Sequence, residues 1–161
     1  MQRMLKYIDT QVVMAEVPDE ITLAINISNC PHHCEGCHSP WLWKDEGKEL
    51  SEPALLWLID KNDGISCVAL MGGDSDPESV VYLASVIRNY YKDIKVCWYS
   101  GFEQLPPVVR DYISLFDYIK LGPYKKDRGG LDCPTTNQRF YKVVDDEFED
   151  ITFRFQKKLT R

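Results

Sequence analysis

An expected strand leads directly into a cysteine-rich loop near the start of the chain. From Ile21 to His38 the chain reads ITLAINISNCPHHCEGCH. Apolar and polar residues alternate over residues 21–28, and this period of two is typical of a half-buried strand. Three cysteines then follow in the spacing Cys-x3-Cys-x2-Cys, at Cys30, Cys34 and Cys37. The pattern predicts a strand that ends in a loop carrying three thiols.

Three thiolates in one short loop suit an iron–sulfur cluster, because cysteine thiolates are its usual ligands. A four-iron cluster that receives three cysteines keeps one iron without a protein ligand. Such an open position distinguishes catalytic metal sites from closed structural ones. A structural zinc site, with His33 or His38 as fourth ligand, is the alternative. We expect a [4Fe–4S] cluster on the three cysteines, with the zinc site as the competing interpretation.

Further along the chain, short apolar runs alternate with helical repeats. Ser51 and Asp76 are expected helix caps, and Pro77 follows Asp76 at the first helical position. Strands are expected over residues 66–71, 94–99, 118–121 and 151–155, helices after each cap and over 105–116, and a loop over 122–137. Strands that alternate with helices predict an α/β fold with a mostly parallel sheet. Because a closed eight-stranded barrel takes about 250 residues, residues 1–161 should form one domain with a partial, open βα barrel.

Four loops that directly follow expected strands carry the candidate site residues. They are the cysteine loop, Gly72-Gly73-Asp74, Ser100-Gly101 and Gly122-Pro123. In open α/β sheets, ligands bind outside the carboxyl ends of the strands. These loops should therefore meet at one edge of the sheet and build one site.

Composition excludes several classes of partner. The formal net charge is −6 and the basic residues are scattered, whereas a nucleic-acid partner needs a basic patch. No run of about 18 apolar residues occurs, so no membrane partner is expected. Residues 1–6 are not followed by the apolar segment of a secretory signal. The six cysteines then suit a metal or redox protein better than a disulfide scaffold. We expect a cytoplasmic protein in an anaerobic setting, because an open iron is easily lost to oxygen.

The cysteine run, taken together with Gly72-Gly73-Asp74, resembles the radical S-adenosylmethionine (SAM) enzymes. In that family three cysteines in this spacing hold a [4Fe–4S] cluster, the methionine part of SAM chelates the fourth iron, and a Gly-Gly-acid motif contacts its amino group. The resemblance implies a barrel of the radical SAM type, with Cys30, Cys34 and Cys37 as metal ligands. It implies cofactor-binding roles for Gly36, Cys37, His38, Gly72, Gly73, Asp74, Ser100 and Lys120.

Several of these roles compete with simpler ones. Ser100 either bonds SAM or makes a local turn bond, and Lys120 either pairs with the SAM carboxylate or faces solvent. The backbone of His38 would reach the adenine, whereas loop histidines are commonly solvated or bonded to the backbone. Cys67 and Cys97 lie within apolar strands and are expected core residues.

The resemblance narrows to the activating proteins of anaerobic (class III) ribonucleotide reductases. That group is short, has a His and a Gly within the cysteine loop, and has segments similar to residues 98–102 (WYSGF), 117–124 (DYIKLGPY) and 136–139 (TNQR). It implies that one electron from the cluster cleaves SAM into methionine and a 5′-deoxyadenosyl radical, which takes a hydrogen atom from a glycine of the reductase. The implied partners are the glycyl-radical subunit of anaerobic ribonucleoside-triphosphate reductase and a one-electron reductant such as flavodoxin.

Two other interpretations stay open. The first is another small radical SAM enzyme, of the pyruvate formate-lyase activating type or the deazaguanine-forming type. The second is a zinc-binding interaction module without catalysis. About four irons per chain after anaerobic purification would favour an enzyme, whereas one zinc would favour the module.

Overall fold

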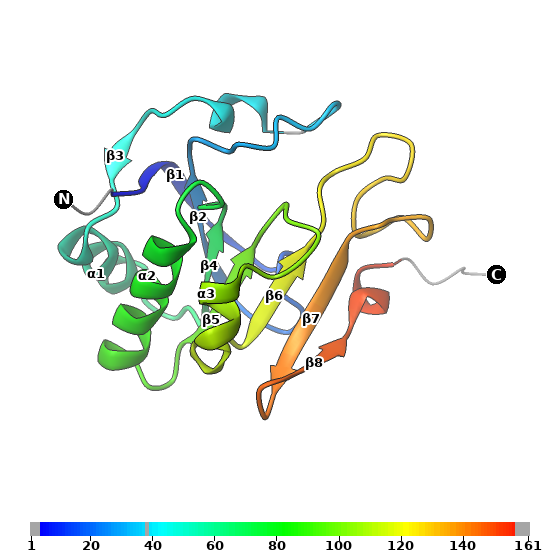
Figure 1. Cartoon of the computed structure of the whole chain (residues 1–161). Coiled ribbons are helices and arrows are strands. Elements are labelled where there is room, and N and C mark those ends of the chain that lie inside the picture. The colour runs from blue at the N-terminus through cyan, green and yellow to red at the C-terminus, as the bar shows by residue number, and fades with distance from the viewer. Residues whose placement is uncertain (1–3, 38, 157–161) are drawn as a thin grey trace.

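One eight-stranded sheet forms the centre of the computed structural model, which describes residues 4–37 and 39–156 (Figure 1). The strands lie in the order β3-β1-β2-β4-β5-β6-β7-β8. They are β1 (Lys6–Val13), β2 (Thr22–Ile27), β3 (Lys48–Glu49), β4 (Cys67–Met71), β5 (Lys95–Tyr99), β6 (Tyr118–Leu121), β7 (Arg139–Val144) and β8 (Glu147–Asp150). Within the described residues the helices are α1 (Glu52–Lys61), α2 (Pro77–Tyr90) and α3 (Pro107–Asp111), with short 3-10 helices η1 (Pro40–Trp43), η2 (Ile113–Leu115) and η3 (Thr152–Phe155).

The predicted partial βα barrel of the radical SAM type, with a mostly parallel sheet, is wrong. Among the described strands, only the β2–β4, β4–β5 and β5–β6 pairs are parallel. The β1–β2, β1–β3, β6–β7 and β7–β8 pairs are antiparallel, so the sheet is mixed and carries few helices. The error comes from the flanking strands. Most residues of β1 and every residue of β8 are at least partly exposed, so these strands lack the apolar alternation that would have revealed them.

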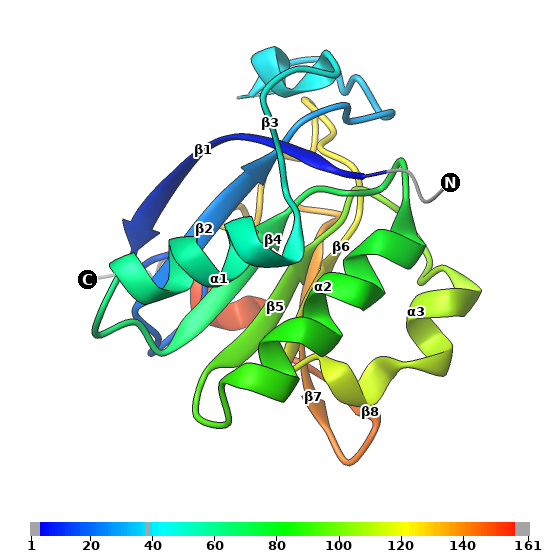
Figure 2. The ribbon, with the colours of Figure 1, turned by 90° about the vertical axis from the view of Figure 1, so that its left-hand side faces the viewer.

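The four central strands place all three helices on one face of the sheet, as Figure 2 shows. The chain passes from β2 through α1 to β4, through α2 to β5 and through α3 to β6, and each step moves one strand along in the same direction. Crossovers between parallel strands are almost always right-handed. Successive right-handed steps in one direction put every connecting helix on the same side.

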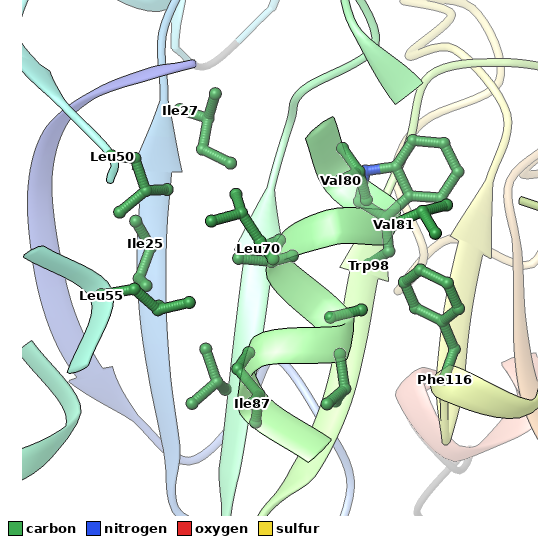
Figure 3. Packing of buried hydrophobic residues seen from close by; sticks show 14 of the residues in the cluster. Ile25, Ile27, Leu50, Leu55, Leu70, Val80, Val81, Ile87, Trp98 and Phe116 are labelled. Carbon is green, nitrogen blue, oxygen red and sulfur yellow. The ribbon is translucent and has the colours of Figure 1, made fainter. Parts of the chain in front are cut away.

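The main core fills the space between these helices and the sheet (Figure 3). Alternate residues of β4 point to opposite faces: Val68 and Leu70 join the core under α2, whereas Cys67 and Ala69 join a smaller cluster on the other face. Trp98 is fully buried in the main core. Cys67 and Cys97 are both fully buried, so the expectation that they are core residues is confirmed.

The expected helix starts are confirmed by their capping bonds. The Ser51 side chain accepts a hydrogen bond from the Ala54 N–H at the start of α1, and Asp76 caps α2 through the Ser79 N–H. The expected helix over 105–116 is instead α3 followed by η2. No helix of the described ranges is both long and apolar enough to cross a bilayer.

The expected strand over 151–155 is also wrong, because these residues form η3. Thr152 turns inward and is 1% exposed, whereas Phe153 is 67% exposed. The Thr152 hydroxyl donates to Asp150 Oδ1 at 2.6 Å and accepts the Phe140 N–H at 2.8 Å. These bonds hold the threonine in the interior, so the apolar alternation of this segment does not mark a strand.

Candidate iron–sulfur site

A cavity of about 220 Å³ lies at the edge of the sheet where β2, β4, β5 and β6 end. The loops that follow these strands lie near one another in Figure 1. The predicted site residues that line this cavity are Cys30, Cys34, Cys37, Gly72, Gly73, Asp74, Ser100 and Lys120. The expected meeting of the four loops is therefore confirmed, and the cavity is called the cysteine cavity below.

Gly36 does not line the cysteine cavity. Gly36 lies elsewhere on the cysteine loop, where a Cβ would come 3.3 Å from Tyr124 Cε2, so it packs against the loop over 122–137. His38 lies outside the described residues.

The cysteine loop is held by backbone hydrogen bonds, one to the segment that follows it and one within the loop. The Cys30 N–H donates to the Leu42 carbonyl at 2.9 Å, and the Cys37 N–H donates to the Cys34 carbonyl at 3.1 Å. All three cysteines are free and half-buried. Burial raises the pKa of the Cys30 thiol, while a hydrogen bond from the His32 backbone opposes that shift. An iron ligand is bound as the thiolate, because a coordinating metal deprotonates the thiol.

Gly72 and Gly73 bring the backbone after β4 close to its neighbours. Both have a positive φ, +120° and +99°, which favours glycine. A Cβ at Gly73 would lie 2.5 Å from Val80 Cγ2, so no larger residue fits there without movement. The Gly72 carbonyl accepts a bond from Trp98 Nε1 at 2.7 Å. The motif is therefore fixed from β5 as well as from α2.

Asp74 is 7% exposed, and its two carboxylate oxygens are used differently. Oδ2 accepts the Gly101 N–H at 2.8 Å and lies 2.5 Å from His32 Nε2. Oδ1 is buried and has no hydrogen-bond partner among the described residues. A buried carboxylate oxygen without a donor is costly, and the oxygen is thus suited to accept a bond from a bound cationic group.

Lys120 does not face solvent; it is buried, with 8% of its surface exposed. Its Nζ donates to the Gly122 carbonyl at 2.7 Å and to the Ser100 carbonyl at 3.1 Å. An ammonium has three N–H donors. Burial lowers its pKa from 10.5 to about 8, and the charges of Asp74 and the three cysteines act in the opposite direction. This lysine is the buried cation of the cysteine cavity.

Ser100 is almost fully buried, and its hydroxyl accepts the Phe102 N–H at 3.0 Å. The local turn bond that competed with a SAM contact is therefore present. The residue still lines the cysteine cavity.

Comparison with known families decides the class of the site. The model of the family described as "4Fe-4S single cluster domain" matches residues 21–139, about three quarters of the chain. The chain belongs to this 4Fe-4S single cluster domain family. No curated protein and no solved structure matched the chain.

Membership of the 4Fe-4S single cluster domain family confirms the prediction of an iron–sulfur protein with a four-iron cluster. The matched range contains the whole cysteine loop and every other loop of the cysteine cavity. Within residues 4–37 and 39–156, no three His, Cys, Asp or Glu side chains converge as a single metal ion requires. A four-iron cluster does not need such convergence, because each cysteine binds a different iron. The three cysteines therefore fit the group that the family holds.

His32 has a role in this 4Fe-4S domain that the sequence pattern does not predict. We expected the loop histidines to be solvated or bonded to the backbone, but His32 contacts Asp74 instead. Its place between two cysteines was the available signal, whereas its partner lies 42 residues away. Asn26 and Gln138 also line the cavity and were not predicted as site residues.

Proposed function

We propose that this 4Fe-4S domain protein is a radical SAM activating enzyme that generates a glycyl radical on anaerobic ribonucleoside-triphosphate reductase. The proposal depends mainly on one observation. The cysteine cavity combines three free cysteines with one unpartnered carboxylate oxygen, on Asp74, and one buried ammonium, on Lys120. A ligand that carries both an ammonium and a carboxylate, such as the methionine part of SAM, matches both charges.

Each group of the cavity has a separate task in this proposal. The three cysteines hold the cluster and leave one iron open. Asp74 Oδ1 accepts a bond from the SAM amino group, and the remaining N–H of Lys120 donates to its carboxylate. Gly72 and Gly73, which lack a Cβ, let the backbone approach the ligand closely. When bound, the reduced cluster supplies one electron that cleaves SAM into methionine and a 5′-deoxyadenosyl radical.

The size of the cavity favours a macromolecular substrate. Its volume of about 220 Å³ is below the roughly 300–1,000 Å³ of pockets that enclose drug-sized ligands. The cavity therefore does not enclose a drug-sized molecule, so SAM and any further substrate would lie partly outside it. A loop of a partner protein would be covered by the partner itself, so it needs no enclosed pocket. The glycyl-radical subunit of the reductase meets this requirement, and a one-electron reductant such as flavodoxin would supply the electron.

The segments that resemble reductase activating proteins support the choice of partner. Residues 98–102 form the end of β5 and the loop after it, where Tyr99, Ser100 and Gly101 line the cysteine cavity. Gln138, from the segment 136–139, lines it from the opposite loop. The similarity thus concentrates where a glycine of the partner would have to approach.

The test is a reaction with and without the partner. Protein reconstituted anaerobically with iron and sulfide is reduced and mixed with SAM, alone or with the reductase subunit. We expect 5′-deoxyadenosine, and a glycyl-radical doublet in the electron paramagnetic resonance spectrum only when the subunit is present. Cys34→Ala should give neither product. Turnover of a metabolite without the subunit would favour another small radical SAM enzyme, and absence of SAM cleavage would refute the proposal.

A further inference from the structure

His32 connects the cysteine loop to the acidic residue of the Gly-Gly-Asp motif. It lies between Cys30 and Cys34, and its Nε2 is 2.5 Å from Asp74 Oδ2. The side chains are 20% and 3% exposed, so the contact is largely shielded from water. Because a carboxylate only accepts hydrogen bonds, Nε2 is the donor.

The His32 ring is also fixed against the loop that follows β5. It packs edge-on against Phe102, with 5.0 Å between ring centroids. A Cβ at Gly101 would lie 2.7 Å from His32 Cδ2, so the ring lies directly against that backbone. The Gly101 N–H in turn donates to Asp74 Oδ2 at 2.8 Å. His32 thus joins the loops after β2, β4 and β5.

The two bonds to Asp74 end on the same oxygen. His32 and the Gly101 N–H both contact Oδ2, whereas Oδ1 is buried without a partner within the described residues. Two donors on one oxygen fix the rotation of the carboxylate. The arrangement therefore determines where Oδ1 lies in the cysteine cavity and keeps it available for a ligand.

We propose that His32 is a positioning residue that orients Asp74 for the SAM amino group and so links the cluster loop to the SAM site. The inference rests on the proposed function, since it needs SAM in the cysteine cavity. His32 itself lines the cysteine cavity, and in this proposal it acts on SAM through its bond to Asp74. Without the bond from His32, the Asp74 carboxylate is free to rotate. Part of the binding energy of SAM is then used to fix that rotation, so SAM binds more weakly.

Two amide substitutions of His32 test whether a side chain must be long enough to donate a hydrogen bond to Asp74. In His32→Gln the side-chain amide extends about as far as Nε2 and can donate to Asp74 Oδ2, whereas in His32→Asn it is too short. His33→Asn is the matched control, because His33 is adjacent in the same loop but stacks on Trp43 with ring centroids 4.8 Å apart. His33 has a φ of +45°, a conformation that Asn tolerates.

The measurement is the dissociation constant of SAM by anaerobic equilibrium dialysis, with iron per chain determined on the same samples. A hydrogen bond to a charged group accounts for roughly tenfold or more in affinity. We expect His32→Asn to bind SAM about tenfold more weakly at unchanged iron content, and His32→Gln and His33→Asn to stay within about threefold of the unmodified protein. Adding His32→Asn to Asp74→Asn should cause no further loss, because the two residues act as one unit.

Three results would overturn the inference that His32 positions Asp74. Equal SAM affinity in His32→Asn and the unmodified protein would overturn it and leave the proposed function intact. Loss of iron from His32→Asn would also overturn it, since His32 would then belong to the groups that hold the cluster. An unmodified protein that holds four irons but does not bind SAM would overturn both proposals.

Discussion

Lys120 is a buried ammonium, and replacing it should change how the stability of the iron-free protein depends on pH. The substitution Lys120→Met keeps an unbranched side chain of similar length and removes the charge. It also leaves the carbonyls of Ser100 and Gly122 without this donor. The cost of losing these two hydrogen bonds does not vary with pH. Any pH dependence in the difference between the two free energies of unfolding therefore comes from the titration of Lys120.

The magnitude follows from the depressed pKa. Burial lowers the pKa of Lys120 from 10.5 to about 8, which corresponds to about 3 kcal/mol at 1.36 kcal/mol per pKa unit. Above pH 8 the folded protein binds fewer protons than the unfolded chain, so its stability rises with pH up to the unfolded pKa. Between pH 7 and pH 9.5 the unmodified protein should therefore gain about 2 kcal/mol relative to Lys120→Met.

The assay is anaerobic urea denaturation of both iron-free proteins at the two pH values. Lys142→Met is the control for loss of a lysine side chain, because Lys142 is exposed on β7. A constant difference between the unmodified protein and Lys120→Met would refute the reasoning.

Three further substitutions test separate parts of the structure. Cys34→Ala should lose most of its iron while Cys133→Ala keeps it, as measured by anaerobic iron analysis; equal iron in both would contradict the ligand assignment. Ser51→Ala removes the cap of α1 and should cost about 1 kcal/mol of unfolding free energy in urea, and no loss would mean that the capping bond is not formed. Gly73→Ala would place a Cβ 2.5 Å from Val80 Cγ2 and should cost roughly 1–3 kcal/mol; an added Val80→Ala should recover part of that cost, and no recovery would locate the strain elsewhere.

The sequence predicted the centre of the sheet well because its strands and helices are buried. β4 is a short apolar run, β6 is buried along its whole length, and the buried face of α2 repeats at helical spacing. The flanking strands could not be predicted in the same way. β3 has only two residues, and β8 is exposed throughout. These strands pair antiparallel with their neighbours. Because the sequence pattern did not reveal them, the predicted sheet was parallel and barrel-like instead of mixed.

The site was predictable as a set of loops but not as a set of contacts. Each loop follows a recognisable strand, and parallel strands end at one edge, so the meeting of the cysteines with Asp74 followed from the pattern. The bond between His32 and Asp74 joins residues 42 positions apart, and no local signal reports it. Nor does a sequence show whether a lysine at a strand end is buried, which for Lys120 depends on the packing of loops around residues 100 and 122.

The most direct test of an open iron that binds SAM is electron paramagnetic resonance of the reduced cluster before and after SAM is added. If three cysteines hold the cluster and SAM occupies the fourth iron, the g values should change in samples that are frozen after SAM is added and before it is cleaved. A cluster whose spectrum stays the same at saturating SAM would contradict this account of the site.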